Sequence, residues 1–175
     1  MPQKKSLSAL RPVARFILFF FILLLLFALI FGYFRSHYQK VITDYLVFTT
    51  SVVKAFLSFI GLNVKGTGTN IFSDKFSIEV VLECAGVYQA VVFSAAVLAF
   101  PTAIKKKLWG ILIGVPLFYL IDILRISGMF LVGSYKPGWF GFFHLYTGQM
   151  LVIFLVIFFW IIWIKKLALN ERKSA

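Results

Sequence analysis

Long apolar segments limit what this 175-residue chain can fold into. The first, residues 16–34, would reach roughly 28 Å as an α-helix, close to the thickness of the bilayer's hydrocarbon core. Three more follow at residues 85–100, 108–134 and 147–164. Only 14% of the residues are charged, compared with about 25% in a soluble domain. We therefore predict a single all-α membrane domain over residues 1–175, built as a bundle of four transmembrane helices.

The first apolar segment is expected to remain in the protein as a membrane anchor. It follows a basic stretch, residues 1–15, that contains no acidic residue. A cleaved signal peptide has a shorter apolar region and a cleavage site of small residues, whereas Arg35 directly follows this phenylalanine- and leucine-rich segment. We therefore predict an uncleaved transmembrane helix.

Two further segments are predicted to cover the outer face of the bundle. Residues 41–62 are apolar on one helical face, but Asp44 and Lys54 recur on the other, and burying both charges would cost several kcal/mol. That pattern favours a helix lying in the membrane interface. In residues 63–83, a glycine- and threonine-rich stretch precedes an alternation of apolar and polar residues, which predicts a small β-hairpin.

The distribution of charge predicts the orientation. With four crossings, both termini and the Lys105–Lys107 loop share one side, which carries eleven basic residues and one acidic residue. The opposite side carries six basic and four acidic residues. Basic loops stay in the cytoplasm, so we place both termini there, including the tail at residues 165–175. Most of the net charge of +12 is thereby explained by topology, and we expect no nucleic-acid partner.

Three chemically important residues are predicted to lie at one depth, near the outer surface. Cys84, the only cysteine, precedes the second apolar segment, and His144 precedes the fourth. Arg125 lies about 26 Å along the third by helix rise. Each has an ordinary explanation when taken alone: a buried packing cysteine, an ion pair between Arg125 and Asp122, and an interfacial histidine. Their convergence points instead to a site.

The chemistry of these residues is that of a cysteine nucleophile. A neighbouring positive charge would lower the pKa of the thiol, and a histidine can carry protons to and from a leaving group. Arg125 can stabilise an oxyanion, and Asp122, three residues earlier on the same helical face, can orient it. Three supporting positions are expected beside the site: Gly86 as a close-approach position, and Tyr88 and Gln149 as pocket-lining or packing residues. The chain has two histidines and one cysteine, so we expect no metal, no cofactor and no internal disulfide.

Several short motifs carry a resemblance to a known family. They are Glu-Cys-Ala-Gly-Val at 83–87, Ser-Ala-Ala-Val-Leu-Ala-Phe-Pro at 94–101, Asp-Ile-Leu-Arg-Ile at 122–126 and Phe-His at 143–144. As an ordered set, from about residue 60 to the end, they resemble the exosortase/archaeosortase family and look most like its short exosortase H branch.

The resemblance implies a membrane-embedded cysteine transpeptidase or endopeptidase in a bacterial inner membrane. Its partners would be membrane-anchored proteins with a C-terminal sorting signal. By the resemblance, Cys84 is the nucleophile, Arg125 the electrostatic stabiliser and His144 the acid/base. The sequence leaves two alternatives open: a non-enzymatic membrane protein such as an assembly subunit or small transporter, in which Asp122 and Arg125 form a structural pair, or a membrane acyltransferase with a lipid-sized tunnel.

Overall fold

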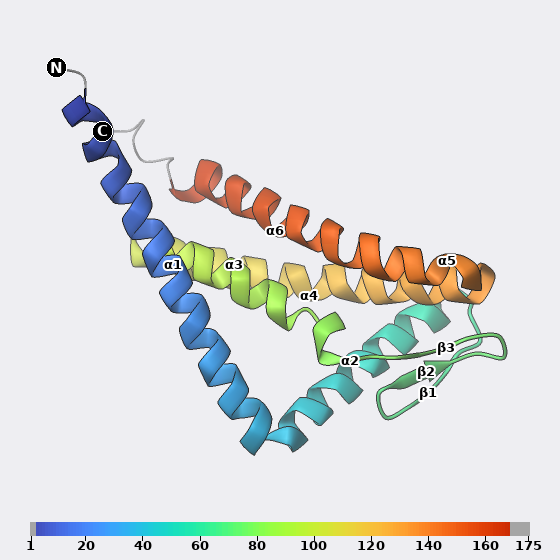
Figure 1. Cartoon of the computed structure of the whole chain (residues 1–175). Coiled ribbons are helices and arrows are strands. Elements are labelled where there is room, and N and C mark those ends of the chain that lie inside the picture. The colour runs from blue at the N-terminus through green and yellow to red at the C-terminus, as the bar shows by residue number, and fades with distance from the viewer. Residues whose placement is uncertain (1–2, 169–175) are drawn as a thin grey trace.

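The computed structural model describes residues 3–168 and is largely helical, as predicted (Figure 1). A small antiparallel sheet lies at one end of the helices. Two π-helical segments, η2 (Phe143–Thr147) and η3 (Ile164–Ala168), flank the last long helix. The α-helices are α1 (Gln3–His37), α2 (Gln39–Phe59), α3 (Val87–Ala99), α4 (Ile104–Tyr135), α5 (Pro137–Phe142) and α6 (Gly148–Trp163).

Four helical segments in the described part of the chain are long and apolar enough to cross a membrane. They are Arg11–His37, Gln39–Phe59, Ile104–Tyr135 and Pro137–Leu167. Three of them contain the predicted first, third and fourth crossings. The remaining one is α2, predicted to lie in the interface, whereas α3 has only 13 residues and a length of about 20 Å. The fold class is confirmed, while the assignment of α3 as the second crossing and of α2 as interfacial stays a prediction.

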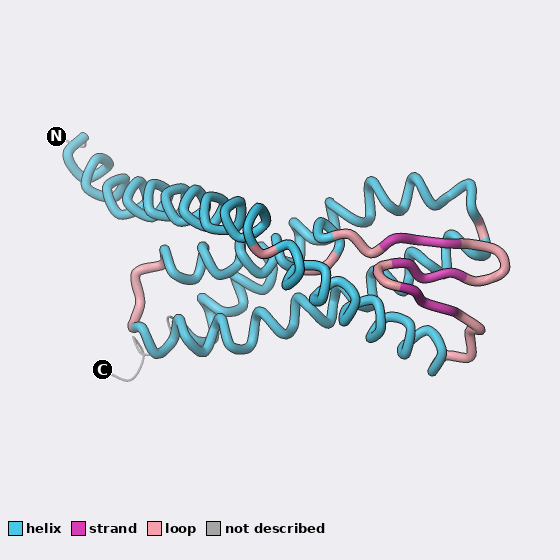
Figure 2. The backbone as a smooth tube through the Cα atoms, turned by 90° about the horizontal axis from the view of Figure 1, so that it is seen from below, coloured by secondary structure: helices cyan, strands magenta, loops and turns pink. Residues whose placement is uncertain are grey.

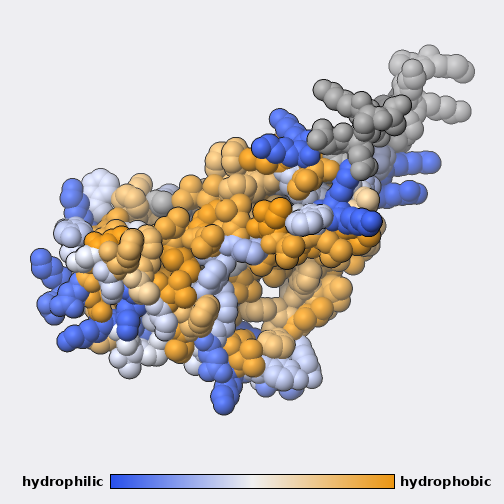
Figure 3. Space-filling model, turned by 180° about the vertical axis from the view of Figure 1, so that it is seen from behind, coloured by the Kyte–Doolittle hydropathy of each residue, from blue (hydrophilic) through white to orange (hydrophobic). Residues whose placement is uncertain are grey.

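The two ends of the molecule differ in composition. The start of α1, the α3–α4 connection and the end of α6 lie at one end, and the sheet and α5 lie at the other (Figure 1). Trp163 Nε1 donates a hydrogen bond to the Lys106 carbonyl over 3.2 Å, which joins the end of α6 to the start of α4. Figure 3 shows an apolar belt across the middle of the molecule, with hydrophilic side chains gathered toward its ends. This distribution suits a chain that crosses a bilayer.

The sheet has one more strand than the predicted hairpin. Strands β1 (Lys65–Thr67), β2 (Asn70–Phe72) and β3 (Ser77–Glu79) pair in the order β1-β2-β3, with every pair antiparallel. Ile71 lies opposite Ile78 in the register. A short 3₁₀ turn, η1 (Leu82–Cys84), then leads from the sheet into the bundle. Strand β3 is therefore an edge strand that runs toward Cys84.

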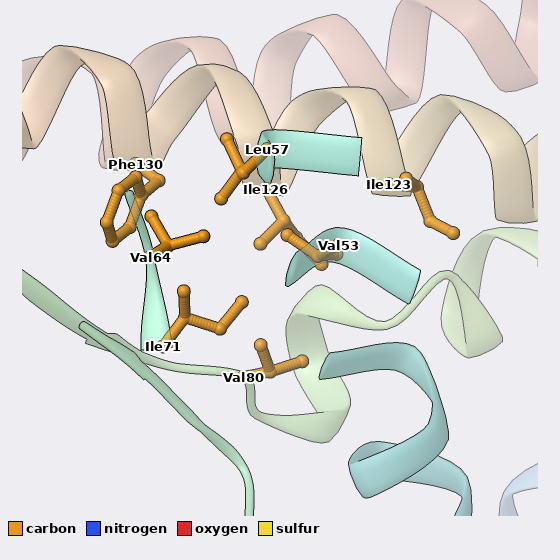
Figure 4. Close-up of a cluster of buried hydrophobic side chains, with 8 residues drawn as sticks. All are labelled: Val53, Leu57, Val64, Ile71, Val80, Ile123, Ile126 and Phe130. Carbon is orange, nitrogen blue, oxygen red and sulfur yellow. The ribbon is translucent and has the colours of Figure 1, made fainter. Parts of the chain in front are cut away.

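Two apolar clusters stabilise the fold, one toward each end of α4. The cluster beside the sheet joins α2, the strands and α4 (Figure 4). Val53 and Leu57 of α2 are fully buried there, whereas Asp44 and Lys54 are exposed, so α2 is amphipathic as predicted. This cluster consists of Val53, Leu57, Val64, Ile71, Val80, Ile123, Ile126 and Phe130. The second cluster joins α3, α4 and α6 through Phe93, Val97, Phe118, Val156 and Trp163.

Candidate active site

Cys84 ends the short turn η1, and the chain reverses into α3 within the next two residues. Gly86 makes this reversal possible because it adopts a left-handed conformation with φ of +77°. It also has no room for a side chain: a Cβ atom there would lie 2.8 Å from Asp122 Oδ2. Gly86 is thus the close-approach position that the sequence indicated, and its neighbour is Asp122 of α4.

Two side chains from other helices hold the carbonyl groups of this turn. The Tyr45 hydroxyl of α2 donates to the Ala85 carbonyl over 2.5 Å, and Arg125 Nη2 of α4 donates to the Cys84 carbonyl over 3.1 Å. Arg125 Nε lies 2.9 Å from Asp122 Oδ1, and both side chains are at least nine-tenths buried. The arginine therefore connects a buried carboxylate to the backbone of the candidate nucleophile. We expected it to face a substrate oxyanion, and in this structure it also positions the turn.

Sequence reasoning missed two residues of this network. Gln89 of α3 is buried, and its Nε2 donates to Asp122 Oδ1 over 3.4 Å. The sequence did contain a signal for Gln89, because it is an amide in an otherwise apolar stretch. Amides inside membranes usually form hydrogen bonds between helices. Tyr45 gave no such signal, because its contact joins segments 40 residues apart.

One cavity brings Cys84 and His144 together. It has a volume of about 240 Å³ and lies between β3, η1, α4 and the α5–η2 segment. The His144 ring stacks on Phe140, with ring centroids 5.6 Å apart, and its side chain is exposed. The lining residues are Ser77, Ile78, Glu79, Val80, Val81, Cys84, Ile126, Met129, Phe140 and His144. Two of the three predicted catalytic residues therefore face a common space.

Arg125 lies on the other side of Met129. It lines a second cavity of about 370 Å³ with Phe143 and other residues of α4 and α6, and Met129 borders both cavities. Its contact with the site is through Cys84: it bonds the Cys84 carbonyl, and its charge acts on the thiol. Cys84 thus bonds Arg125 through its carbonyl and shares a cavity with His144.

The electrostatics of the thiol differ from the sequence-based expectation. Burial raises the pKa of the Cys84 thiol above its ordinary value, and this effect exceeds the opposing charge of Arg125. Asp122 and Glu83 raise the pKa further, because a second negative charge nearby disfavours the thiolate. We expected Arg125 to lower the pKa overall, but the burial of the thiol outweighs the effect of this charge. The thiolate form of Cys84 is therefore disfavoured.

Of the remaining predicted positions, Tyr88 lies away from the cavity and the side chain of Gln149 is outside the described residues. Tyr88 faces α1, where its ring makes an edge contact with Phe31 at a centroid distance of 5.7 Å. Tyr88 is therefore a helix-packing residue, which was one of its two expected roles. Gln149 belongs to α6, but its side chain lies outside the described residues. Glu83 is exposed, with its carboxylate 3.8 Å from the Arg35 guanidinium.

Comparison with known proteins decides the family. The chain matches the family described as transmembrane exosortase (Exosortase_EpsH) over residues 7–163. It belongs to the exosortase family. Archaeosortase A of Haloferax volcanii is 30% identical over 83 residues, which are 47% of this chain and 25% of archaeosortase A. The matched segment thus spans about a quarter of that relative. No solved structure matches the chain.

The family assignment confirms the resemblance inferred from the motifs and extends it toward the N-terminus, since the match begins at residue 7 and not near residue 60. Family membership and the four long apolar helices together make this exosortase-family chain a multi-pass membrane protein. The segment joining Cys84 to Arg125 and His144 lies wholly within the matched range.

An apolar groove of about 760 Å³ in this exosortase-family chain reaches the turn that follows Cys84. Helices α1, α2, α3 and α4 all contribute to it, and Figure 3 shows an opening beside the lower half of α1. On α3, one helical face of small residues lines the groove, formed by Ala90 and Ser94 after Gly86. Tyr45 borders the groove while its hydroxyl holds the Ala85 carbonyl, so the groove ends two residues from Cys84.

Proposed function

We propose that this chain is a membrane-embedded cysteine transpeptidase or endopeptidase that cleaves the C-terminal sorting signals of exported proteins. In this proposal it lies in a bacterial inner membrane, with both termini in the cytoplasm and the active site at the extracytoplasmic face. The observation that carries the proposal is the cavity shared by Cys84, which precedes α3 in the chain, and His144, which follows α5. Family membership gives the chemistry its general class.

In the proposed reaction, His144 accepts the proton of the Cys84 thiol as sulfur attacks the scissile carbonyl carbon. The carbonyl π electrons move to oxygen, and Arg125 stabilises the negative charge that develops near Cys84. The tetrahedral intermediate collapses, the C–N bond breaks, and His144 protonates the leaving amine. An acceptor amine or water then attacks the thioester, His144 removes its proton, and the thiolate leaves and is protonated again.

The raised pKa of the Cys84 thiol bears on how this reaction begins. Because burial raises the pKa of Cys84, a preformed thiolate is disfavoured and deprotonation needs a base close by. His144 lies in the same cavity and is exposed, so it can exchange protons with both the thiol and a leaving amine. Proton transfer coupled to substrate binding would also protect a lone thiol from unwanted reactions.

The apolar groove is the proposed seat of the substrate's transmembrane helix. Membrane helices pack closely where small residues line the contact, and Gly86, Ala90 and Ser94 give such a face in the groove. A helix seated there would bring the segment that precedes it toward Cys84. Other small residues of α3, namely Ala95, Ala96 and Ala99, are buried inside the bundle and do not line the groove.

A non-enzymatic membrane protein remains the competing class. Under that alternative the Asp122–Arg125 pair is structural, and its burial agrees with such a role. It gives no reason for Cys84 and His144 to share a cavity. The alternatives differ in what happens to exported proteins when the thiol is removed.

The test replaces Cys84 by Ser in the cells that make this protein. Membrane-anchored exported proteins are then analysed by mass spectrometry for their C-terminal peptides. We expect a set of proteins to lose their C-terminal helix and basic tail in wild-type cells and to retain both in Cys84→Ser cells, with restoration by the wild-type chain. Unchanged C-termini in the presence of stably inserted Cys84→Ser protein would refute the enzymatic proposal.

A further inference from the structure

Strand β3 presents an unpaired backbone edge. Val80 N donates to Thr69 O, and Ser73 N donates to Phe76 O, on either side of the Ile71–Ile78 pair. In an antiparallel ladder, hydrogen-bonded pairs alternate with non-hydrogen-bonded pairs. The N–H and C=O groups of Ser77 and Glu79 therefore point away from β2, and among residues 3–168 no other strand lies beyond β3.

The catalytic cavity lies along this edge. Five consecutive residues, Ser77 to Val81, line it together with Cys84 and His144. Side chains of a strand alternate between its two faces, so a cavity on one face would be lined by every second residue. A cavity lined by the whole run borders the backbone of the strand. The unpaired groups of Ser77 and Glu79 thus open toward the space that contains the candidate nucleophile.

We propose that β3 binds the substrate segment preceding the scissile bond as an added β-strand, through its main-chain groups. This proposal rests on the proposed function and names how the peptide is held. Addition to an exposed sheet edge is a general way for proteins to bind extended peptides, because the hydrogen bonds come from backbone groups that every peptide has. An unprotected edge is otherwise a site of unwanted pairing, which gives a reason for its use here.

The direction of the added strand follows from the fold. Strand β3 runs from the sheet end of the molecule toward η1 and Cys84 (Figure 1; Figure 2 shows the same strands from below). In the proposed complex, the exported part of the substrate lies outside the membrane and its C-terminal helix lies in the groove. The substrate chain then also runs from the sheet end toward Cys84. The bound segment is therefore parallel to β3. From Ser77 to Glu79 the edge offers two N–H and two C=O groups, about 7 Å of extended chain.

The protein-side test uses Glu79, the outward-facing residue nearer Cys84. Glu79→Pro removes the outward N–H without touching the bonds to β2, and proline is tolerated on edge strands. Glu79→Ala is the matched control, since it loses the same carboxylate and its bond from Thr69 Oγ1 but keeps the N–H. Full-length protein in detergent micelles is treated with biotinylated tetrapeptide vinyl sulfones of mixed sequence, or with iodoacetamide, which needs no peptide site.

We expect Glu79→Pro to lower the rate of Cys84 labelling by the peptide reagent about two- to tenfold relative to Glu79→Ala, the range that one net hydrogen bond gives. Iodoacetamide labelling should be the same in both variants. Equal peptide labelling of the two variants, or no preference of wild-type Cys84 for the peptide reagent over its amino-acid analogue, would overturn the edge proposal while leaving the proposed nucleophile intact. A dimer in wild type that Glu79→Pro dissociates would instead make β3 a contact between copies, and would also overturn it.

The reagent-side test changes no residue of the protein. The tetrapeptide vinyl sulfone is N-methylated at one position at a time and reacted with wild-type protein. Strand addition predicts a period of two: methylation at alternate residues slows labelling about two- to tenfold, and methylation at the others leaves it unchanged. A uniform effect at every position would exclude pairing with β3. Failure of both reagents to label Cys84 in folded protein would count against the proposed function itself.

Discussion

The cysteine and histidine sides of the candidate catalytic cavity are held in different ways. On the cysteine side, Tyr45 and Arg125 bond to the backbone of residues 84–85, and Gly86 packs directly on Asp122. On the histidine side, His144 lies in a π-helical segment, is exposed, and stacks on Phe140. The candidate nucleophile is therefore positioned by buried polar contacts, whereas the proposed acid/base lies at a surface. Changes on the first side should affect folding and chemistry together, and changes on the second should affect chemistry alone.

Arg125→Ala should have the largest effect on stability. It leaves Asp122 as a buried carboxylate without its partner, a change that costs about 3–5 kcal/mol in buried ion pairs. The measurement is the free energy of unfolding in detergent micelles. Arg35→Ala is the control, because the Arg35–Glu83 pair is exposed and should change that free energy by less than about 0.5 kcal/mol. Equal stability of the two variants would mean that the cysteine side is not held by this pair.

Gly86→Ala should come next. A left-handed alanine costs about 1–2 kcal/mol, and the new Cβ would meet Asp122 Oδ2 at 2.8 Å, adding roughly 1–3 kcal/mol of overpacking. Gly68→Ala separates the two effects, since Gly68 has φ of +59° but nothing within 4 Å of a Cβ atom. The difference between the two unfolding free energies measures the contact with Asp122. Equal destabilisation of the two variants would contradict the close approach of Gly86 to Asp122 of α4.

Tyr45→Phe should have a smaller effect, of about 1 kcal/mol, since it removes one hydroxyl and leaves the Ala85 carbonyl without its donor. Substrate processing should fall as well, because the turn that carries Cys84 is less well positioned. Tyr119→Phe is the matched control: its hydroxyl is 3.5 Å from Thr49 Oγ1, the limit of a hydrogen bond. Processing that is unchanged in Tyr45→Phe would show that the turn is held without this contact.

His144→Ala should leave the unfolding free energy within about 0.5 kcal/mol of wild type, because the side chain is exposed. Processing should nevertheless fall by about 10²- to 10⁴-fold, the usual contribution of a general acid/base. His37→Ala is the control, because His37 stacks on Tyr33 of α1 and lies outside the cavity. Strong destabilisation by His144→Ala would remove the contrast between the two sides of the cavity.

The pH dependence of Cys84 labelling sharpens the electrostatic part of the comparison. The rate of iodoacetamide labelling rises as the thiol ionises, and its midpoint should lie above that of a free cysteine, because burial raises the pKa. Arg125→Gln removes a charge that favours the thiolate and should raise the pKa further, whereas Asp122→Asn should lower it. Glu83→Gln should lower it less than Asp122→Asn does. A midpoint below that of free cysteine in wild type would instead support the prediction from sequence that a neighbouring positive charge lowers the pKa of the thiol.

Sequence patterns predicted the long helices well because hydrophobicity is a local property. The crossings expected at residues 16–34, 108–134 and 147–164 lie inside α1, α4 and the helical segment Pro137–Leu167. The amphipathic face of α2 was also recognised, since its polar residues repeat at helical spacing. Helix α1 extends beyond the predicted crossing and begins at Gln3, because helical hydrogen bonding does not stop where a bilayer does.

The sequence by itself determined which residues are available to the candidate site: one thiol, an arginine with an aspartate three residues before it in an apolar segment, and a histidine predicted to lie near the same depth. Only the tertiary structure decided how they meet. It placed Cys84 and His144 in one cavity, added Tyr45 and Gln89 to the network, and turned an expected hairpin into a sheet with an open edge beside the thiol. It also reversed the expected pKa shift of Cys84. These features depend on contacts between segments distant in the chain and on burial, and neither is encoded in local periodicity.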